Sequence, residues 1–143
     1  MVKVYYGKKG TGKTKHMLDS ANGLVSTSKG NVIYIDDSDE LKLKLDHSIR
    51  FVNILDYPVK GAESFLGFLC GVASQNYDIE TIFVDGLTYI VEQSADELSR
   101  FFTAIDELAE KHKVDFYMSI NGNTRYFKPF SKNYICGFLT YSR

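Results

Sequence analysis

The residues with the clearest capacity for chemistry lie near the start of the chain, at positions 7–14, where the sequence reads GKKGTGKT. This segment fits the pattern G-x-x-x-x-G-K-[ST] in full, and loops of that pattern cradle phosphate groups. Glycine lets the backbone adopt conformations that other residues avoid, so that N–H groups of the loop can converge on an anion. We therefore predict a polyphosphate site formed by Gly7, Lys8, Lys9, Gly10, Thr11, Gly12, Lys13 and Thr14.

Three side chains are expected to act on that polyphosphate and on its metal ion. The ammonium of Lys13 is expected to bridge the terminal phosphates and take part in catalysis, and the hydroxyl of Thr14 is expected to bind Mg²⁺. Asp85 directly follows the apolar run at 82–84, so a buried strand would deliver its carboxylate beside the loop as a second magnesium ligand.

Polar residues also end a later apolar run, where Ser119 and Asn121 follow residues 114–118. Asn121 is a candidate for sensing the terminal phosphate or positioning a water molecule. The alternative is a turn, because Asn-Gly-Asn at 121–123 favours a turn by its own chemistry. The sequence leaves both interpretations open.

Short apolar runs predict the strands that would carry these groups, at residues 2–6, 31–35, 81–84 and 114–120, with two further candidates at 50–55 and 134–139. Helices are predicted from residue 13 onward, over 62–74, and after a capping box formed by Ser94 and Glu97. Residues 62–74 are apolar on almost every side of a helix, which predicts either deep burial or presentation to a partner.

Strands that alternate with helices, and that are continuously apolar, predict an α/β fold with a mostly parallel central sheet of about five strands and helices on both faces. No linker or repeat divides the 143 residues, so we predict one domain over 1–143. The carboxyl ends of parallel strands share one edge, where α/β proteins bind their ligands. The loop, Asp85 and Asn121 are therefore expected to meet there.

The phosphate loop, the acidic segment 36–40 after the second strand, the Asp-tipped strand and the polar-tipped strand together resemble the P-loop NTPases of the ASCE division, and most of all the RecA/KaiC-type ATPase core. The resemblance implies ATP and Mg²⁺ as ligands and a catalytic carboxylate after the second strand. Ser38 stands where the family has Glu, so Asp37 or Asp39 would serve instead. Ile120-Asn121-Gly122 is similar to the Ile-Asn-Gln of RecA proteins, with Gly122 in place of the phosphate-sensing Gln.

In RecA-like assemblies a neighbouring subunit supplies an arginine to the site, so the resemblance implies a homo-oligomer. The candidates are Arg50, Arg100, Arg125 and Arg143, and the alternative is that all four are solvated surface residues. The leading hypothesis is an ATPase that acts in an assembly or on a nucleic-acid or protein partner. A nucleotide-gated binding protein with little hydrolysis is a second. A small-molecule kinase is a third, because Asp37-Ser38-Asp39 resembles the D-x-D of shikimate-kinase-like enzymes. The N-K-x-D motif of GTPases is absent, which favours ATP.

The remaining composition is that of an ordinary globular protein, with 44% hydrophobic residues and a net charge of −1. The stretch 124–143 interleaves aromatic residues with Arg125, Lys128, Lys132 and Arg143, which suits single-stranded nucleic acid, a subunit interface or plain core completion. Cys70 and Cys136 are expected to be reduced, partly buried thiols. With no apolar run long enough to span a membrane, we expect a cytoplasmic protein.

Overall fold

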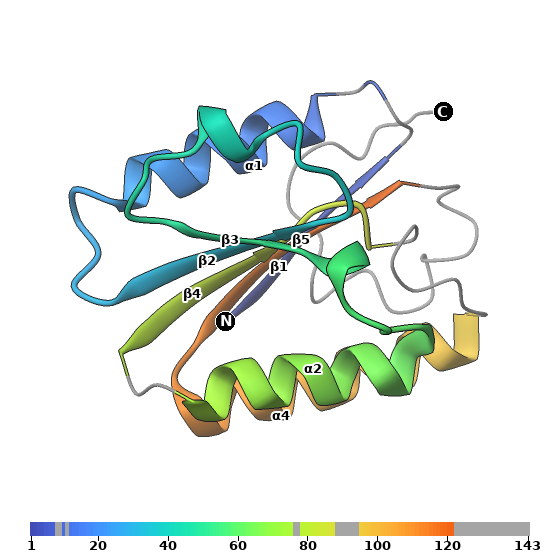
Figure 1. Cartoon of the computed structure of the whole chain (residues 1–143). Coiled ribbons are helices and arrows are strands. Elements are labelled where there is room, and N and C mark those ends of the chain that lie inside the picture. Colours follow the sequence, from blue (N-terminus) through green and yellow to red (C-terminus); the bar gives the residue numbers. More distant parts are fainter. Residues whose placement is uncertain (8–9, 11, 76–77, 88–94, 122–143) are drawn as a thin grey trace.

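The computed structural model describes residues 1–7, 10, 12–75, 78–87 and 95–121. Its five strands form a parallel sheet in the order β1-β5-β4-β2-β3 (Figure 1), which confirms the predicted α/β class. The strands are β1 (Val2–Gly7), β2 (Asn31–Asp36), β3 (Arg50–Asn53), β4 (Ile79–Val84) and β5 (Asp115–Asn121). The helices are α1 (Lys13–Leu24), α2 (Gly61–Gln75) and α4 (Ala95–His112), with 3₁₀ turns η1 (Lys42–Lys44) and η2 (Ile54–Asp56).

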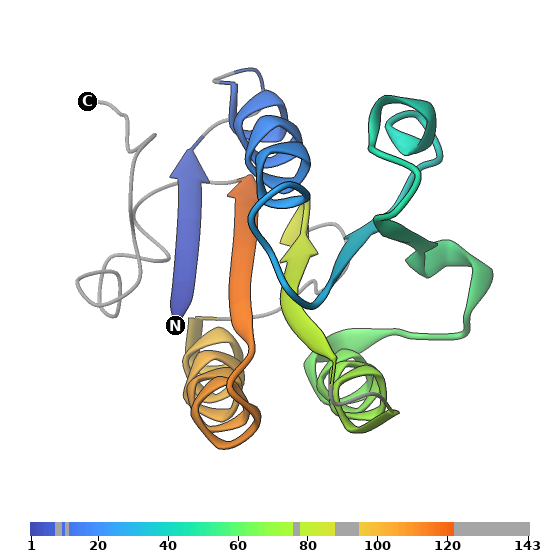
Figure 2. The same cartoon turned by 90° about the vertical axis from the view of Figure 1, so that its left-hand side faces the viewer.

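Helices cover both faces of the sheet, as the sequence predicted. Helix α1 lies on one face, and α2 and α4 lie side by side on the other (Figures 1 and 2). The reason is the handedness of crossover connections, which is almost always right-handed. The chain moves along the sheet in one direction from β1 to β2 and in the opposite direction from β3 to β4 and from β4 to β5, so the connecting helices fall on opposite faces.

The larger hydrophobic core lies between the sheet and helices α2 and α4. Apolar residues at a spacing of three and four on α4, among them Phe101, Phe102 and Ile105, are buried there against alternate strand residues such as Ile82 and Phe116. The smaller core lies under α1, where Met17 and Ala21 pack on Tyr34 and Phe83. Strand residues therefore alternate between two buried faces, which explains why each strand reads as a continuous apolar run.

Several sequence-based boundaries need correction. β2 extends through Asp36, one residue beyond the predicted end. Residues 54–56 form the turn η2 instead of continuing β3, because the Asn53 side chain accepts a hydrogen bond from the Leu55 N–H and caps that turn. Cys70 is exposed on α2, although partial burial was expected, since only one stripe of this apolar helix faces the core.

The expected strand at 134–139, Cys136, the stretch 124–143 and the capping residue Ser94 all lie outside the described residues. Among the helices that the structure describes, none combines the length and the apolar character that crossing a bilayer requires.

Candidate nucleotide site

The site is built at the carboxyl edge of the sheet, where β1 ends and α1 begins. Gly12 caps α1 in the left-handed backbone region, with φ of 93°, and Gly10 has φ of 88°. These are conformations that glycine adopts at little cost, as the motif predicted. Lys13 opens the helix, is 4% exposed, and its Nζ donates to the Gly7 carbonyl at 2.9 Å. Lys8, Lys9 and Thr11 lie outside the described residues.

Asp85 lies at the centre of a hydrogen-bonded network just after β4. Its Oδ1 accepts from the Ser119 hydroxyl at 2.6 Å and from the Thr14 hydroxyl at 3.3 Å. Its Oδ2 accepts from the Tyr34 hydroxyl at 2.9 Å. Ser119 accepts in turn from the Gly86 N–H at 2.7 Å. Thr14 and Asp85, 71 positions apart in the chain, thus come together as the sequence predicted.

The acidic segment after β2 divides between the site and the solvent. Asp36 ends β2 and is 8% exposed, and its Oδ1 accepts the N–H of Asp37 at 2.7 Å. Asp37 is half-buried beside it, whereas Asp39 is exposed and accepts from the Asn53 amide at 3.2 Å. Of the two carboxylates predicted to be catalytic, the structure therefore places Asp37 at the site and turns Asp39 towards β3.

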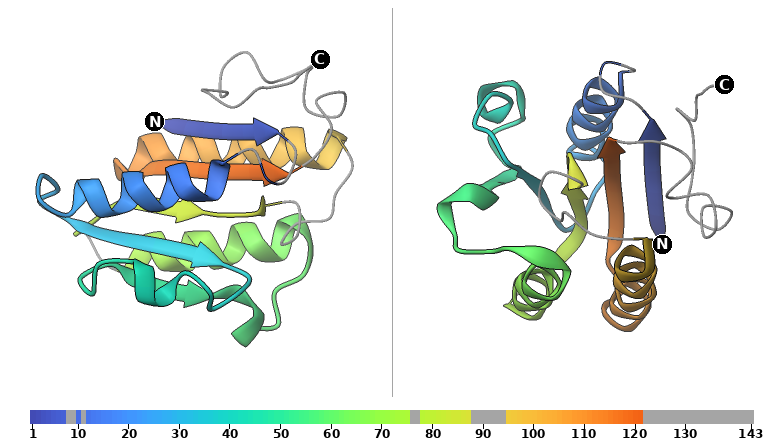
Figure 3. Two further views of the ribbon diagram at one scale, coloured as in Figure 1. Left: turned by 90° about the horizontal axis from the view of Figure 1, so that it is seen from above. Right: turned by 90° about the vertical axis from the view of Figure 1, so that its right-hand side faces the viewer.

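These groups surround a cavity of about 420 Å³, which we call the rim cavity. Its size falls within the range of small-molecule sites. The helices that follow β1 and β4 among the described elements, α1 and α4, lie on opposite faces of the sheet (Figure 3). Open α/β sheets bind ligands at the carboxyl edge where successive connections change face in this way. Its lining residues are Gly10, Gly12, Lys13, Thr14, Asp36, Asp37, Ser38, Glu40, Leu41, Asp85, Gly86 and Asn121.

Burial disfavours the charged forms of the groups around the rim cavity. Desolvation lowers the pKa of Lys13, and the nearby Asp85 carboxylate offsets part of that effect. Desolvation raises the pKa of Asp36 to about 8, and repulsion by Asp85 adds to the increase. Desolvation and the Asp85 carboxylate likewise raise the pKa of the Tyr34 hydroxyl, which therefore stays a neutral hydrogen-bond donor. Lys13 and Asp36 both line this cavity, and groups with perturbed pKa values in a cleft are candidates for a functional site.

The oxygen atoms at this edge suit a hard divalent cation. A hydroxyl and a carboxylate, from Thr14 and Asp85, are already within 3.3 Å of each other, and Mg²⁺ prefers such oxygen ligands. Within the described ranges there is no cluster of three or more His, Cys, Asp or Glu side chains that could hold a metal ion by themselves. A nucleotide-bound Mg²⁺ needs only one or two protein ligands, because phosphates and water supply the others.

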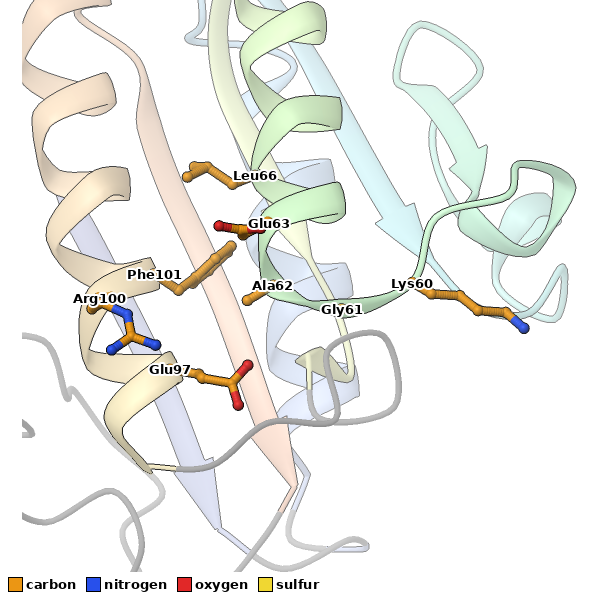
Figure 4. A pocket seen from close by; sticks show the side chains of 8 residues that line it. All are labelled: Lys60, Gly61, Ala62, Glu63, Leu66, Glu97, Arg100 and Phe101. Atoms are coloured by element: carbon orange, nitrogen blue, oxygen red, sulfur yellow. The ribbon is translucent and has the colours of Figure 1, made fainter.

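A second cavity, of about 390 Å³, lies where α2 and α4 begin. Figure 4 shows Glu63 on α2 and Glu97 and Arg100 on α4 around Phe101, while the Lys60 side chain points away from the other labelled residues. Its charges are mixed and do not converge on one point. This arrangement suits a polyphosphate far less well than the rim cavity does.

The structure places two further side chains at the site that the sequence did not single out, Tyr34 and Asp36. In the sequence, Tyr34 looks like an ordinary core residue of an apolar strand, and only the pairing of β2 with β4 brings its hydroxyl to Asp85.

Of the arginines considered for a subunit-supplied role, Arg50 and Arg100 are exposed, and Arg125 and Arg143 lie outside the described residues. Asn121 lines the rim cavity, so its predicted location is confirmed. No protein-family model matches the chain, and no curated protein matches it in sequence.

Proposed function

We propose that this chain is a P-loop NTPase of RecA-like type that binds ATP with Mg²⁺ in the rim cavity. The observation that carries the proposal is the convergence of three groups at one helix N-terminus. The Lys13 ammonium, the Thr14 hydroxyl and the Asp85 carboxylate gather beside the left-handed Gly10 and Gly12. A helix N-terminus favours an anion, and the ammonium adds a full positive charge.

Each group has a distinct part in binding and turnover. The loop and Lys13 hold the phosphates and stabilise the charge that develops on the transferred group. Thr14 and Asp85 would hold Mg²⁺, which supplies charge neutralisation to the phosphates when bound. Asp37, half-buried in the cavity wall, would orient an attacking water molecule, and Asn121, which lines the same cavity, would hydrogen-bond near the terminal phosphate.

The deciding experiment is isothermal titration of the full chain with ATP, ADP and GTP, each with Mg²⁺ and with EDTA. We expect ATP to bind in the presence of Mg²⁺. Lys13→Ala should weaken that binding by about 30-fold or more, because it removes the buried ammonium that pairs with the phosphates. Lys15→Ala is the matched control, since Lys15 lies on the same helix but is exposed and paired with Asp19. Absence of affinity for all three nucleotides would refute the proposal, and equal loss in both lysine variants would refute the site.

A nucleotide-gated binding protein is the second candidate, and the position of Asp39 favours it. Asp39 is engaged with Asn53 outside the cavity, which leaves Asp37 as the remaining predicted catalytic carboxylate. Phosphate release from MgATP, compared between the wild type and Asp37→Asn, separates the two. Turnover that depends on Asp37 supports the ATPase, and tight binding without turnover supports the gated binder. Phosphate release without any added acceptor also counts against a small-molecule kinase.

A further inference from the structure

A row of stacked side chains crosses the whole sheet beneath α1. Phe51 of β3, Tyr34 of β2, Phe83 of β4 and Tyr117 of β5 are direct register partners. Their ring centroids lie 6.5, 5.6 and 4.7 Å apart along the row, with interplanar angles of 18°, 13° and 15°. Lys3 of β1 completes the row, with its ammonium 5.4 Å from the Tyr117 ring centroid. We call this set the aromatic row.

The next residues on the same face form a polar row at the edge of the sheet. Side chains two positions apart on a strand share a face, so Asp36, Asp85 and Ser119 follow Tyr34, Phe83 and Tyr117 respectively. One member of the aromatic row reaches across to the polar row, because the Tyr34 hydroxyl donates to Asp85 Oδ2 at 2.9 Å. The Tyr34 side chain is fully buried, and stacking on both of its faces fixes its ring.

The donors to Asp85 are divided between its two oxygen atoms. Ser119 and Thr14 donate to Oδ1, the oxygen that lies towards the start of α1. Tyr34 donates to the other oxygen, Oδ2. Because its two oxygens accept hydrogen bonds from side chains on two different strands, the Asp85 carboxylate is held in one orientation. Loss of a hydrogen bond that orients a metal-binding carboxylate typically lowers metal affinity about 10- to 100-fold.

We propose that Tyr34 is a positioning residue, which the aromatic row holds so that its hydroxyl orients the Asp85 carboxylate towards Mg²⁺ of the bound nucleotide. This inference rests on the proposed nucleotide function and adds a residue to it. It makes a specific claim: loss of the hydroxyl impairs the part of nucleotide affinity that depends on Mg²⁺, and leaves the affinity of the loop for phosphates unchanged.

Tyr34→Phe tests the claim, because it keeps the ring and the stack and removes only the hydroxyl. ATP titration is run in Mg²⁺ and in EDTA for the wild type, Tyr34→Phe and the control Tyr117→Phe, which removes from the same row a hydroxyl that makes none of the three hydrogen bonds to Asp85 described above. We expect the Mg²⁺-dependent gain in affinity to fall about tenfold in Tyr34→Phe alone, with binding in EDTA unchanged. Equal losses with Mg²⁺ and with EDTA, or a wild-type profile, would overturn the proposal.

A second variant covers the case in which Tyr34→Phe does not fold. Phe51→Leu removes one of the two rings that stack on Tyr34 at the half-buried edge of the sheet and keeps the hydroxyl. We expect a smaller loss, about two- to threefold, again confined to binding in Mg²⁺, and an unchanged profile would count against the proposal. Wild-type protein that binds no nucleotide would instead refute the proposed function, so the two failures are distinguishable.

Discussion

The buried carboxyl of Asp36 should make the stability of this protein fall as pH rises through the neutral range. The pKa of Asp36 is raised to about 8, by burial and by repulsion from Asp85, whereas an unfolded chain leaves an Asp near 3.9. Between these two values the folded protein holds a proton that the unfolded protein has released. The free energy of unfolding therefore decreases with pH across that window. Below about pH 4 the contribution is complete, and above about pH 8 it is lost.

The size of the effect can be bounded from the same numbers. Each unit of pKa difference corresponds to about 1.4 kcal/mol, so a difference of about four units sets a ceiling near 5 kcal/mol. The Asp36 carboxyl lines the rim cavity, where water reaches part of it, so we expect about 1–3 kcal/mol between pH 5 and pH 8. Asp36→Asn cannot ionise and should lose this dependence. It should match the wild type near pH 5 and exceed it in stability at pH 8.

Urea unfolding of both proteins at pH 5, 6, 7 and 8 measures the difference directly. Subtracting the two curves removes every pH-dependent contribution that the two proteins share. Asp56→Asn is the control, because it removes one negative charge from an exposed position. Parallel curves for the wild type and Asp36→Asn, or a gap larger at pH 5 than at pH 8, would contradict a raised pKa for Asp36.

Two further predictions concern the scaffold. Gly30→Ala should destabilise the protein by about 1–3 kcal/mol, because the added Cβ meets the Asp78 carbonyl and lies 2.9 Å from the Glu80 Cβ. Gly71→Ala should instead stabilise the protein by about 0.5–1 kcal/mol, because a Cβ at this position inside α2 meets nothing within 4 Å. Thermal unfolding checks the opposite signs, and a loss of stability in both would contradict the packing. Leu69→Ala, at a fully buried position, should lower the free energy of unfolding by about 2–5 kcal/mol. Cys70→Ser, on the exposed side of the same helix turn, should change it by less than about 0.5 kcal/mol. Denaturant unfolding of both variants measures the two effects.

The general position of the site could be predicted from the sequence because it depends on local patterns and one topological rule. The G-x-x-x-x-G-K-[ST] pattern, between a predicted strand and a predicted helix, fixes where Lys13 and Thr14 lie along the chain. Parallel strands then bring their carboxyl ends, with Asp85 and Asn121, to the same edge. Neither step requires knowledge of which strand pairs with which. That is why Thr14 and Asp85 could be predicted to meet across 71 positions.

The finer composition of the site could not be predicted, because it depends on strand register and on the exact residue at which a strand ends. Four acidic residues lie within positions 36–40, and their pattern does not tell which of them faces inward. β2 continues through Asp36, so this side chain keeps the alternation of Tyr34 and faces the α1 side. Asp39 lies beyond the strand and turns to Asn53. A shift of one residue in the strand end decides which carboxylate is buried.

The arrangement of charges in the rim cavity argues for a ligand site over a purely structural network. Burial opposes the ammonium of Lys13 and the carboxylate of Asp36 alike, and apolar side chains of similar volume would stabilise a fold at least as well as buried ions do. A scaffold that needed only stability could carry apolar residues in place of the polar row. The opposite face of the sheet, under α2 and α4, is lined by apolar strand residues of that kind. In the polar row, Asp85 accepts three side-chain hydrogen bonds, from β2, from β5 and from α1. A carboxylate held from three elements, beside an ammonium and two left-handed glycines, favours selection for binding a polyphosphate and its cation.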